Sequence, residues 1–293
     1  MEGKYKVVFL GKDNRQISAA AALSEYGYLT SLWGESGREE LAASLKDASA
    51  VVLPLPASLD GITLNARVRE GEESVRFGCL LDLISESEIG LVLGGRMPEA
   101  FVTAARQRRI KCIDYFASEY FQEKNAYITA EAALSLAMKS IDKTIGEGRF
   151  ALTGYGRIAS RLAGLLRLMG GEVTVAARKE SAMASAELLG CSTLNIGKNK
   201  EGEISQLESG YDVIFNTVPS LLFGREFLEK LDKGTLIIEL ASSPGGIDTD
   251  AARALESRVL WASALPSKYA PASAGALVAE CIRRILDEEA VRL

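Results

Sequence analysis

An α/β protein with two domains is predicted by three features of the sequence. Short apolar runs alternate with helix-like stretches along the whole chain, which is typical of parallel sheets. The chain has 293 residues, enough for two domains with separate cores. A glycine-rich turn between a strand-like run and a helix-like segment lies at Gly154–Gly156, near the middle of the chain. A complete domain therefore has room to precede this turn.

Composition excludes several classes of protein. The hydrophobic fraction of 47% and the charged fraction of 25% are those of a globular protein. A net charge of −5 argues against general binding to nucleic acid or to an anionic membrane. The basic cluster at 106–111 is interpreted as a solvated helix end, with an anion site as the alternative. No run is long enough for a signal peptide or a membrane span, so we expect a cytoplasmic protein.

Metal chemistry is not expected. The chain contains no histidine, and its four cysteines are scattered without a CxxC pair. Zinc sites are built from closely spaced cysteines and histidines, so no metal ligand set is predicted. The cysteines are interpreted as small core residues in a reducing compartment.

The first domain is predicted over 1–128. Its elements are strands at 5–10, 50–55, 90–93 and 111–114 and a helix at 17–26, with a loop or hairpin at 60–78.

A long helix is predicted to cross between the domains. Apolar residues recur at helical spacing over 126–147, with Thr129 as the N-cap and Gly146 and Gly148 as the stop signal. The interdomain segment is accordingly 129–148.

The second domain is predicted over 149–272. Six strands are expected, at 150–153, 172–176, 192–196, 212–217, 235–240 and 259–262. Six parallel strands with intervening helices form a doubly wound, Rossmann-type sheet. A final helix at about 273–289, within 273–293, is expected to return to the first domain.

The glycine turn has the pattern of a dinucleotide-binding site. Gly154 allows the tight turn, Gly156 allows close approach of a pyrophosphate, and Ala159 completes a GxGxxA motif. The phosphates would lie on the N–H groups at the helix N-terminus. The candidate binding residues here are Gly154, Tyr155, Gly156, Arg157 and Ile158. An ordinary glycine turn is the alternative.

The following strand indicates which cofactor is bound. NAD-binding sites normally place Asp or Glu at its end, whereas this chain has Arg178 and Lys179, with Ser181 nearby. An arginine fork suits a 2′-phosphate, so NADP is favoured over NAD. The segment Asn216, Thr217, Val218 and Pro219 is a candidate for the nicotinamide half, or a simple strand-to-turn signal.

Three polar segments are candidates for binding a substrate. Asn14 and Arg15 follow the first strand, and a serine- and glycine-rich turn follows the fifth strand of the second domain, with Ser242, Ser243, Gly245 and Gly246 as donors to a carboxylate. Asn125, Thr129 and Glu131 on the crossing helix are weaker candidates. If the domains face each other across a cleft, the three segments converge there. A surface arginine and a plain loop are the alternatives.

A set of ordered motifs resembles the A subunits of the dipicolinate synthase family. These are GKDNRQ, NAYITAEAALSLAM, TGYGRIASRLA, NTVPS, ELASSPGGID and ALPSKYAPASAGALVAE, which together span nearly the whole chain. The resemblance implies NAD(P)-dependent oxidation of dihydrodipicolinate, or of its 4-hydroxy precursor, to dipicolinate. It also implies a flavoprotein-like B subunit as partner and expression in the mother cell during sporulation. We further expect a homo-oligomer.

The chain departs from the family motif at two positions. The motif carries a basic residue after Leu-Ala-Ser, where this chain has Ser243, and a lysine after Ala-Pro, where it has Ala272. Lys268 lies upstream and is a candidate replacement. Aromatisation of a dihydropyridine lessens the need for a strong base, which makes the absence of histidine tolerable. Lys268, Tyr269 and a bound water remain open as the proton acceptor.

Two other functions are compatible with parts of the sequence. D-2-hydroxyacid dehydrogenases share the two-domain pattern, but they use a histidine for proton transfer and this chain has none. A non-catalytic NADP-binding regulatory or scaffold protein would carry the same glycine motif. In that case Arg15 and the 242–246 turn would meet no ligand, and substitutions there would leave the behaviour of the protein unchanged.

Overall fold

The computed structural model describes residues 5–34, 37–66, 73–197 and 204–291. The chain divides into two compact units. The first unit combines Met1–Asn125 with Pro266–Leu293, and the second unit is Ala126–Leu265. Each unit contains one parallel sheet, so the predicted α/β class is confirmed.

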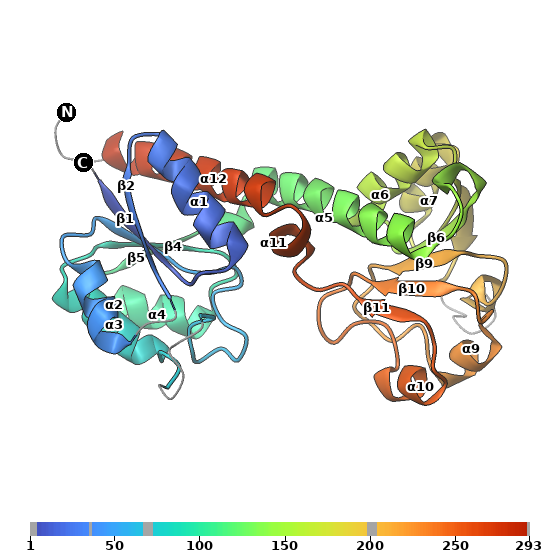
Figure 1. The fold of residues 1–293 in the computed structure, drawn as a ribbon, viewed down its shortest axis with the longest axis horizontal. Coiled ribbons are helices and arrows are strands. Elements are labelled where there is room, and N and C mark those ends of the chain that lie inside the picture. Colours follow the sequence, from blue (N-terminus) through green and yellow to red (C-terminus); the bar gives the residue numbers. More distant parts are fainter. Residues whose placement is uncertain (1–4, 35–36, 67–72, 198–203, 292–293) are drawn as a thin grey trace. The chain divides into compact units, whose positions relative to one another are not determined.

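The first unit is built on a five-stranded sheet of order β2-β1-β3-β4-β5 (Figure 1). Its strands are β1 (Lys6–Leu10), β2 (Leu29–Trp33), β3 (Ala50–Val52), β4 (Leu91–Gly94) and β5 (Lys111–Asp114). Its helices include α1 (Asn14–Glu25), α2 (Arg38–Leu45), α3 (Phe77–Glu86) and α4 (Glu99–Gln107). Apolar runs such as Val7–Leu10 are completely buried, because helices cover both faces of the sheet.

Most of the predicted elements of this unit are present. Strand β2 and helix α2 were not predicted, and they fill the interval between α1 and β3. The segment predicted as a loop or hairpin contains an antiparallel bridge between Thr63 and Arg76 and gives way to α3. Its central part, residues 67–72, lies outside the described residues.

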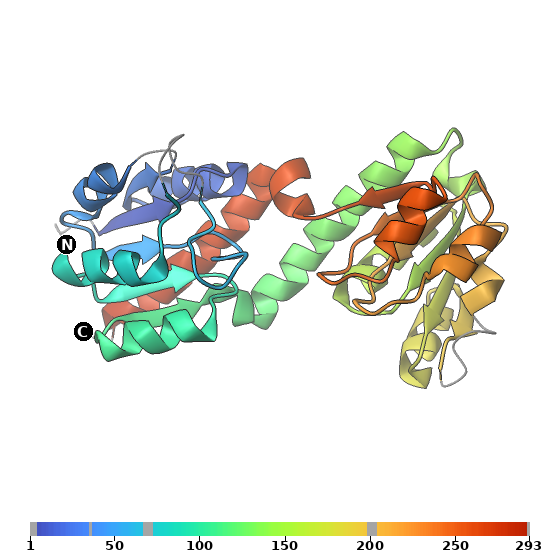
Figure 2. The same cartoon turned by 90° about the horizontal axis from the view of Figure 1, so that it is seen from below.

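The C-terminal helix packs on the first unit, as predicted. Helix α12 (Pro271–Val291) lies along α1 in both views (Figures 1 and 2). Gly275 makes this close approach possible, because a Cβ at this position would collide with the Cβ of Ser18. The contact fixes the start of α1, where Arg15 lies.

The second unit has a six-stranded parallel sheet of order β11-β10-β9-β6-β7-β8. The strands are β6 (Arg149–Thr153), β7 (Glu172–Ala177), β8 (Ser192–Asn195), β9 (Val213–Asn216), β10 (Leu236–Glu239) and β11 (Val259–Trp261), which confirms all six predicted strands. The helices include α6 (Arg157–Leu168), α7 (Glu180–Leu188), α9 (Arg225–Lys230) and α10 (Thr249–Ala254). The strand order reverses at β6, and parallel sheets bind ligands at the carboxyl ends of strands near such a point.

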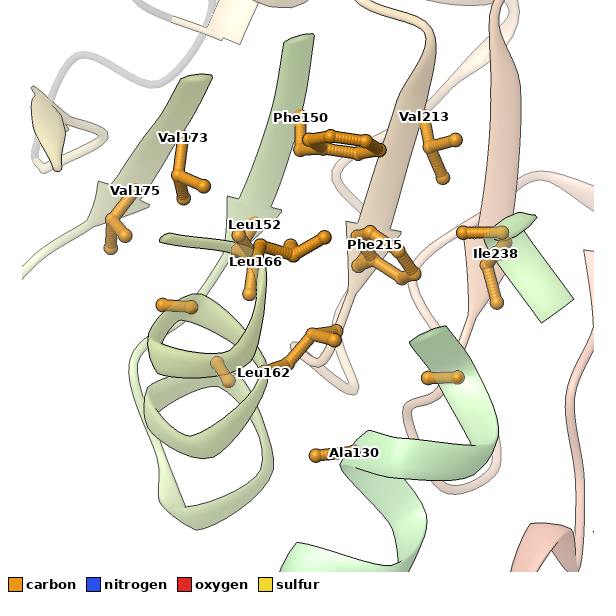
Figure 3. Packing of buried hydrophobic residues seen from close by; sticks show 14 of the residues in the cluster. Ala130, Phe150, Leu152, Leu162, Leu166, Val173, Val175, Val213, Phe215 and Ile238 are labelled. Atoms are coloured by element: carbon orange, nitrogen blue, oxygen red, sulfur yellow. The ribbon is translucent and has the colours of Figure 1, made fainter. Parts of the chain in front are cut away.

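The core of the second unit lies between its sheet and two helices. Phe150 and Phe215, on neighbouring strands, belong to the same buried cluster as Leu162 and Leu166 of α6 (Figure 3). Ala130, from the helix that precedes the sheet, packs into the same cluster. This packing holds α6 against the face of the sheet.

The long helix differs from its prediction. Helix α5 spans Glu119–Ser140, followed by a short 3₁₀ turn at Ile145–Glu147, rather than one helix over 126–147. Thr129 is therefore a buried residue inside the helix and not its N-cap. The division between the two units falls within α5, after Asn125.

Candidate functional site

The turn after β6 has the geometry of a phosphate cradle. Gly154 has a φ of +81°, and its N–H donates to the carbonyl of Ala176 over 2.8 Å. A Cβ here would lie 2.8 Å from the hydroxyl of Thr217, so a side chain is excluded on two grounds. Gly156 is the N-cap of α6 and offers no side-chain cap, and a Cβ built on it would meet no atom within 4 Å. The position directly before the first turn of α6 is therefore open and lacks a capping side chain.

The other residues of the predicted motif lie at the start of α6 and differ in burial. Tyr155 is half-buried, and this burial raises the pKa of its hydroxyl. Arg157 is exposed at the start of α6 and Ile158 is half-buried. Ala159 is fully buried and packs the helix against the sheet.

The end of β7 carries positive charge. Arg178 and Lys179 are exposed directly after the strand, and Ser181 is exposed in the first turn of α7. Within the described part of the chain, neither cation forms a side-chain hydrogen bond or an ion pair. The acidic residues nearest in sequence are Glu172, at the opposite end of β7, and Glu180, which begins α7. The strand end thus offers cations where an NAD site would offer a carboxylate.

A buried polar network joins the ends of three neighbouring strands. Asn216 is fully buried at the end of β9, and its amide donates to both carboxylate oxygens of Glu239 over 2.9 Å. The Asn216 carbonyl oxygen accepts from the hydroxyl of Thr153 over 2.5 Å and from the N–H of Val218 over 3.1 Å. Glu239 is 4% exposed at the end of β10.

This network changes the role expected for Asn216. Each polar atom of its side chain is already bonded within the protein, so Asn216 shapes the following loop rather than offering a free group to a ligand. Thr217 similarly donates its hydroxyl to the carbonyl of Thr153 over 2.7 Å. Val218 is half-buried and Pro219 is exposed. These two residues are the accessible part of the segment.

Glu239 also takes up donors that were expected to bind a substrate. Its carboxylate accepts from the N–H of Ala241 over 2.8 Å and from the N–H of Gly246 over 2.9 Å. The Gly245 N–H donates to the carbonyl of Ser242 over 2.9 Å. The backbone donors of Gly245 and Gly246 thus serve the turn itself, which differs from the prediction. Ser242 and Ser243 are exposed and keep their hydroxyls on the surface of the turn.

In the first unit, Arg15 is a buried cation beside the carboxyl ends of the strands. It is 6% exposed near the start of α1, and its Nη2 donates to the carbonyl of Leu55. Asp13, the N-cap of α1, lies 4.0 Å from the same nitrogen and accepts from the Gln16 N–H over 2.9 Å. Gln16, also buried, donates to the carbonyl of Leu10 over 2.9 Å. These contacts hold the guanidinium close to the end of β1.

Tyr115 follows β5 at the same edge of the sheet. It is 2% exposed, and its hydroxyl has no hydrogen-bond partner in the described structure. Burial raises the pKa of this hydroxyl strongly, and nearby Arg15 opposes the shift. Sequence reasoning missed Tyr115, Thr153 and Glu239.

The remaining candidates are not all brought together. Asn14 is exposed at the first position of α1. Half-buried Asn125 and buried Thr129 lie one turn apart on α5, whereas exposed Glu131 lies on a different face of that helix. Two further candidates, Lys268 and Tyr269, are exposed on the short helix α11 (Leu265–Tyr269).

The described residues show neither a metal site nor a membrane span. They contain no group of three or more Cys, Asp or Glu side chains arranged to hold a metal ion. None of the described helices is long and apolar enough to cross a membrane.

Comparison with known proteins gives a whole-length match. No family model matches the chain. It is 26% identical over 294 residues to the A subunit of dipicolinate synthase from Bacillus subtilis strain 168, covering 97% of this chain and 96% of that protein. The resemblance to the A subunits of dipicolinate synthase is confirmed. This similarity supports an oxidoreductase-type family.

Solved structures show the same fold. The A subunit of dipicolinate synthase from Bacillus halodurans aligns with a TM-score of 0.80 and 23% identity, covering 97% of this chain and 99% of that one. A D-lactate dehydrogenase from Escherichia coli aligns with a TM-score of 0.62 and 13% identity over 97% of this chain and 96% of that one. The two-domain dehydrogenase fold is therefore shared, although this chain lacks the histidine on which D-2-hydroxyacid dehydrogenases rely.

Proposed function

We propose that this chain oxidises dihydrodipicolinate, or its 4-hydroxy precursor, to dipicolinate with a nicotinamide dinucleotide. The observation that carries the proposal is the whole-length similarity to the A subunit of dipicolinate synthase, together with an open glycine cradle at the end of β6. The same similarity supports assembly with a B subunit and a role in the mother cell of a sporulating bacterium. A homo-oligomer remains part of the proposal.

The second unit supplies the cofactor site. The bound nucleotide supplies the acceptor for a hydride. Gly154 and Gly156 leave room for a pyrophosphate beside the N–H groups that begin α6, where the helix dipole favours anions. Arg178 and Lys179 provide charge for a 2′-phosphate, which favours NADP over NAD. The network of Asn216 and Glu239 holds the adjoining loop in one conformation.

Arg15 is proposed to bind a carboxylate of the substrate. Its planar fork suits a carboxylate, and its burial strengthens the attraction because water screens it less. The exposed hydroxyls of Ser242 and Ser243 are candidates for the second carboxylate. Both side chains are uncharged, so neither Ser242 nor Ser243 replaces the basic residue that the family motif carries after Leu-Ala-Ser. Exposed Lys268 and Tyr269 remain candidates for accepting the proton.

The proposed reaction needs orientation more than strong acid–base catalysis. A hydride leaves one saturated ring carbon of the dihydropyridine and a proton leaves its neighbour, and the aromatic ring that forms supplies the driving force. For the hydrated precursor, loss of water comes first. Groups that hold both carboxylates therefore contribute through positioning.

The test measures two products together. The purified chain is mixed with NADP⁺ and freshly generated dihydrodipicolinate, with and without the B subunit, while NADPH and dipicolinate are both followed. We expect the two products in equal amounts, and any dependence on the B subunit defines the functional unit. Tight binding of NADP⁺ without dipicolinate formation, even with the partner present, would instead indicate a non-catalytic binding protein.

A further inference from the structure

The hydroxyl of Tyr115 is a buried polar group without a partner. The residue is 2% exposed, and no described atom forms a hydrogen bond with its oxygen. Leaving such a group unpaired is unfavourable, because it has lost its hydrogen bonds to water, so proteins rarely retain one without a reason. The aromatic ring has an evident structural role, because it packs on Phe121 with the ring centroids 5.2 Å apart. It also lies over Gly95, where a Cβ would come within 3.1 Å of the ring. Only the hydroxyl is unexplained.

Arg15 and Tyr115 both pack around Leu55 and Gly95, and Arg15 is also incompletely paired. A Cβ on Gly95 would lie 2.5 Å from the Leu55 side chain and 3.1 Å from the Tyr115 ring, while the Leu55 carbonyl accepts from Arg15. Its guanidinium has five N–H donors, of which the described contacts use one for the carbonyl of Leu55. The segments that follow β1, β3 and β5 thus bring a buried cation, the carbonyl that it bonds to and an unpaired hydroxyl to the same end of the sheet. The guanidinium and the hydroxyl are donors, and two such donors are complementary to an anion.

The nearby acidic side chains do not satisfy these donors. Asp13 lies 4.0 Å from the Arg15 guanidinium, beyond hydrogen-bond distance, and its other oxygen caps α1. Asp114 accepts from the N–H groups of Met97 and Phe116, over 3.1 Å and 2.8 Å. Both carboxylates are therefore occupied by backbone donors.

We propose that the Tyr115 hydroxyl and the Arg15 guanidinium together bind one carboxylate of the pyridine dicarboxylate substrate. This inference rests on the proposed function and assigns Tyr115 as a further substrate-binding residue. The hydroxyl donates to one carboxylate oxygen and the guanidinium to the other, so the unpaired donor gains its partner only when the substrate is bound. We therefore expect the Tyr115 hydroxyl to lower the stability of the free protein and to raise its affinity for the substrate.

The test compares Tyr115→Phe with Tyr120→Phe in the full chain, with dipicolinate as the probe. Tyr120 is a matched control, because its hydroxyl bonds to the carboxylate of Glu280 over 2.9 Å. For Tyr115→Phe we expect an unchanged or raised Tm without ligand, a roughly tenfold higher Kd for dipicolinate, and an unchanged Kd for NADP⁺. For Tyr120→Phe we expect a lower Tm and an unchanged Kd for dipicolinate.

Two results would overturn the inference in distinguishable ways. If the wild-type chain binds dipicolinate and Tyr115→Phe binds it equally well, Tyr115 does not contact the substrate. If the wild-type chain neither binds dipicolinate nor forms it with the B subunit present, the proposed function fails and this inference fails with it.

Discussion

The side-chain amide of Asn216 donates to both carboxylate oxygens of Glu239 over 2.9 Å, in the interior of the second unit. The same carboxylate accepts from the N–H groups of Ala241 and Gly246. One buried carboxylate side chain thus holds together the loop after β9 and the turn after β10. Because each of its partners is a donor, this position requires a group that only accepts.

Glu239→Gln is expected to destabilise the protein. The new amide nitrogen cannot accept, so at least one buried donor around it loses its partner, at a cost of about 1–3 kcal/mol in the free energy of unfolding. Binding of NADP⁺ should weaken as well, because the loop beside the glycine cradle loses its anchor. Urea unfolding and calorimetric titration measure the two effects.

Glu226→Gln is the matched control for this change. Glu226 is exposed and pairs with Lys230 across one turn of α9, a solvent-screened contact that adds little to stability. A variant at Glu239 that is no less stable than this control would show that the buried network does not need a carboxylate.

Substitutions at two glycines should separate cofactor binding from folding. Gly156→Ala places a methyl group in open space at an ordinary φ of −82°, so we expect normal stability. The methyl group blocks the approach of a pyrophosphate, and the Kd for NADP⁺ should rise at least about tenfold. Gly164→Ala, in the interior of α6 with nothing within 4 Å, should instead stabilise the chain by up to about 1 kcal/mol and leave binding unchanged. Equal affinities for NADP⁺ in the two variants would place the phosphates elsewhere.

Arg178 is expected to decide which nucleotide is preferred. Arg178→Ser removes a guanidinium from the end of β7, and the Kd for NADP⁺ should rise about tenfold while the Kd for NAD⁺ changes little. Arg253→Ser, at an exposed position on α10, controls for the loss of charge. If the preference between the two nucleotides does not change, Arg178 does not contact a 2′-phosphate.

Arg15→Lys tests the carboxylate site while keeping the charge. Lysine lacks the planar fork and bonds a carboxylate through one point, so KM for the dicarboxylate should rise about tenfold. Nucleotide affinity should stay unchanged, because Arg15 belongs to the first unit. The same substitution at exposed Arg38, which begins α2, should leave KM as it is. A normal KM for Arg15→Lys would remove Arg15 from the substrate site.

Stability at alkaline pH should depend on Cys281. Burial raises the pKa of this thiol from its ordinary value of 9.0 to about 11. As the pH rises past 9.0, the thiol ionises in the unfolded chain while the folded chain keeps its proton, so the folded state loses stability up to about pH 11. Cys281→Ala removes this loss. Between pH 9.0 and about pH 11, the unfolding free energy of the variant should therefore fall less than that of the wild-type protein, by on the order of 1 kcal/mol. Unfolding curves of the wild-type protein and of Cys281→Ala at several pH values measure this difference. An equal loss of stability in both proteins would contradict the burial argument.

The fold could be predicted largely from local patterns. The six strands of the second unit are short apolar runs bounded by turns, and each prediction agrees with the structure to within a few residues. Strand β2 was missed because only Trp33 in it is buried, so it lacks the apolar run of an interior strand. Helix α5 was placed too late because Thr129 resembles a local N-cap, whereas buried Phe121 extends the helix toward its N-terminus.

The glycine cradle could be predicted because its conformation depends on a few consecutive residues. The hydrogen bonds of Glu239 could not be predicted. In the sequence, a glutamate at the end of a strand looks like any solvated residue, and only the fold brings Asn216 and Gly246 to it. In the sequence, Tyr115 could not be told apart from the other aromatic residues that form the core. An acidic residue closing the apolar run 236–239 is the one local sign of the buried network.

The most direct test of the account follows the transferred hydrogen. Dihydrodipicolinate carrying deuterium at both saturated ring carbons is mixed with NADP⁺ and the chain, together with the B subunit, and the reduced nucleotide is examined by mass spectrometry. We expect one deuterium in each NADPH formed and an equal amount of dipicolinate. At an NADP⁺ concentration near the wild-type Kd, Gly156→Ala should form both products more slowly. Dipicolinate formed with unlabelled NADPH, or at the wild-type rate by Gly156→Ala at that concentration, would contradict hydride transfer to a nucleotide bound at the glycine cradle.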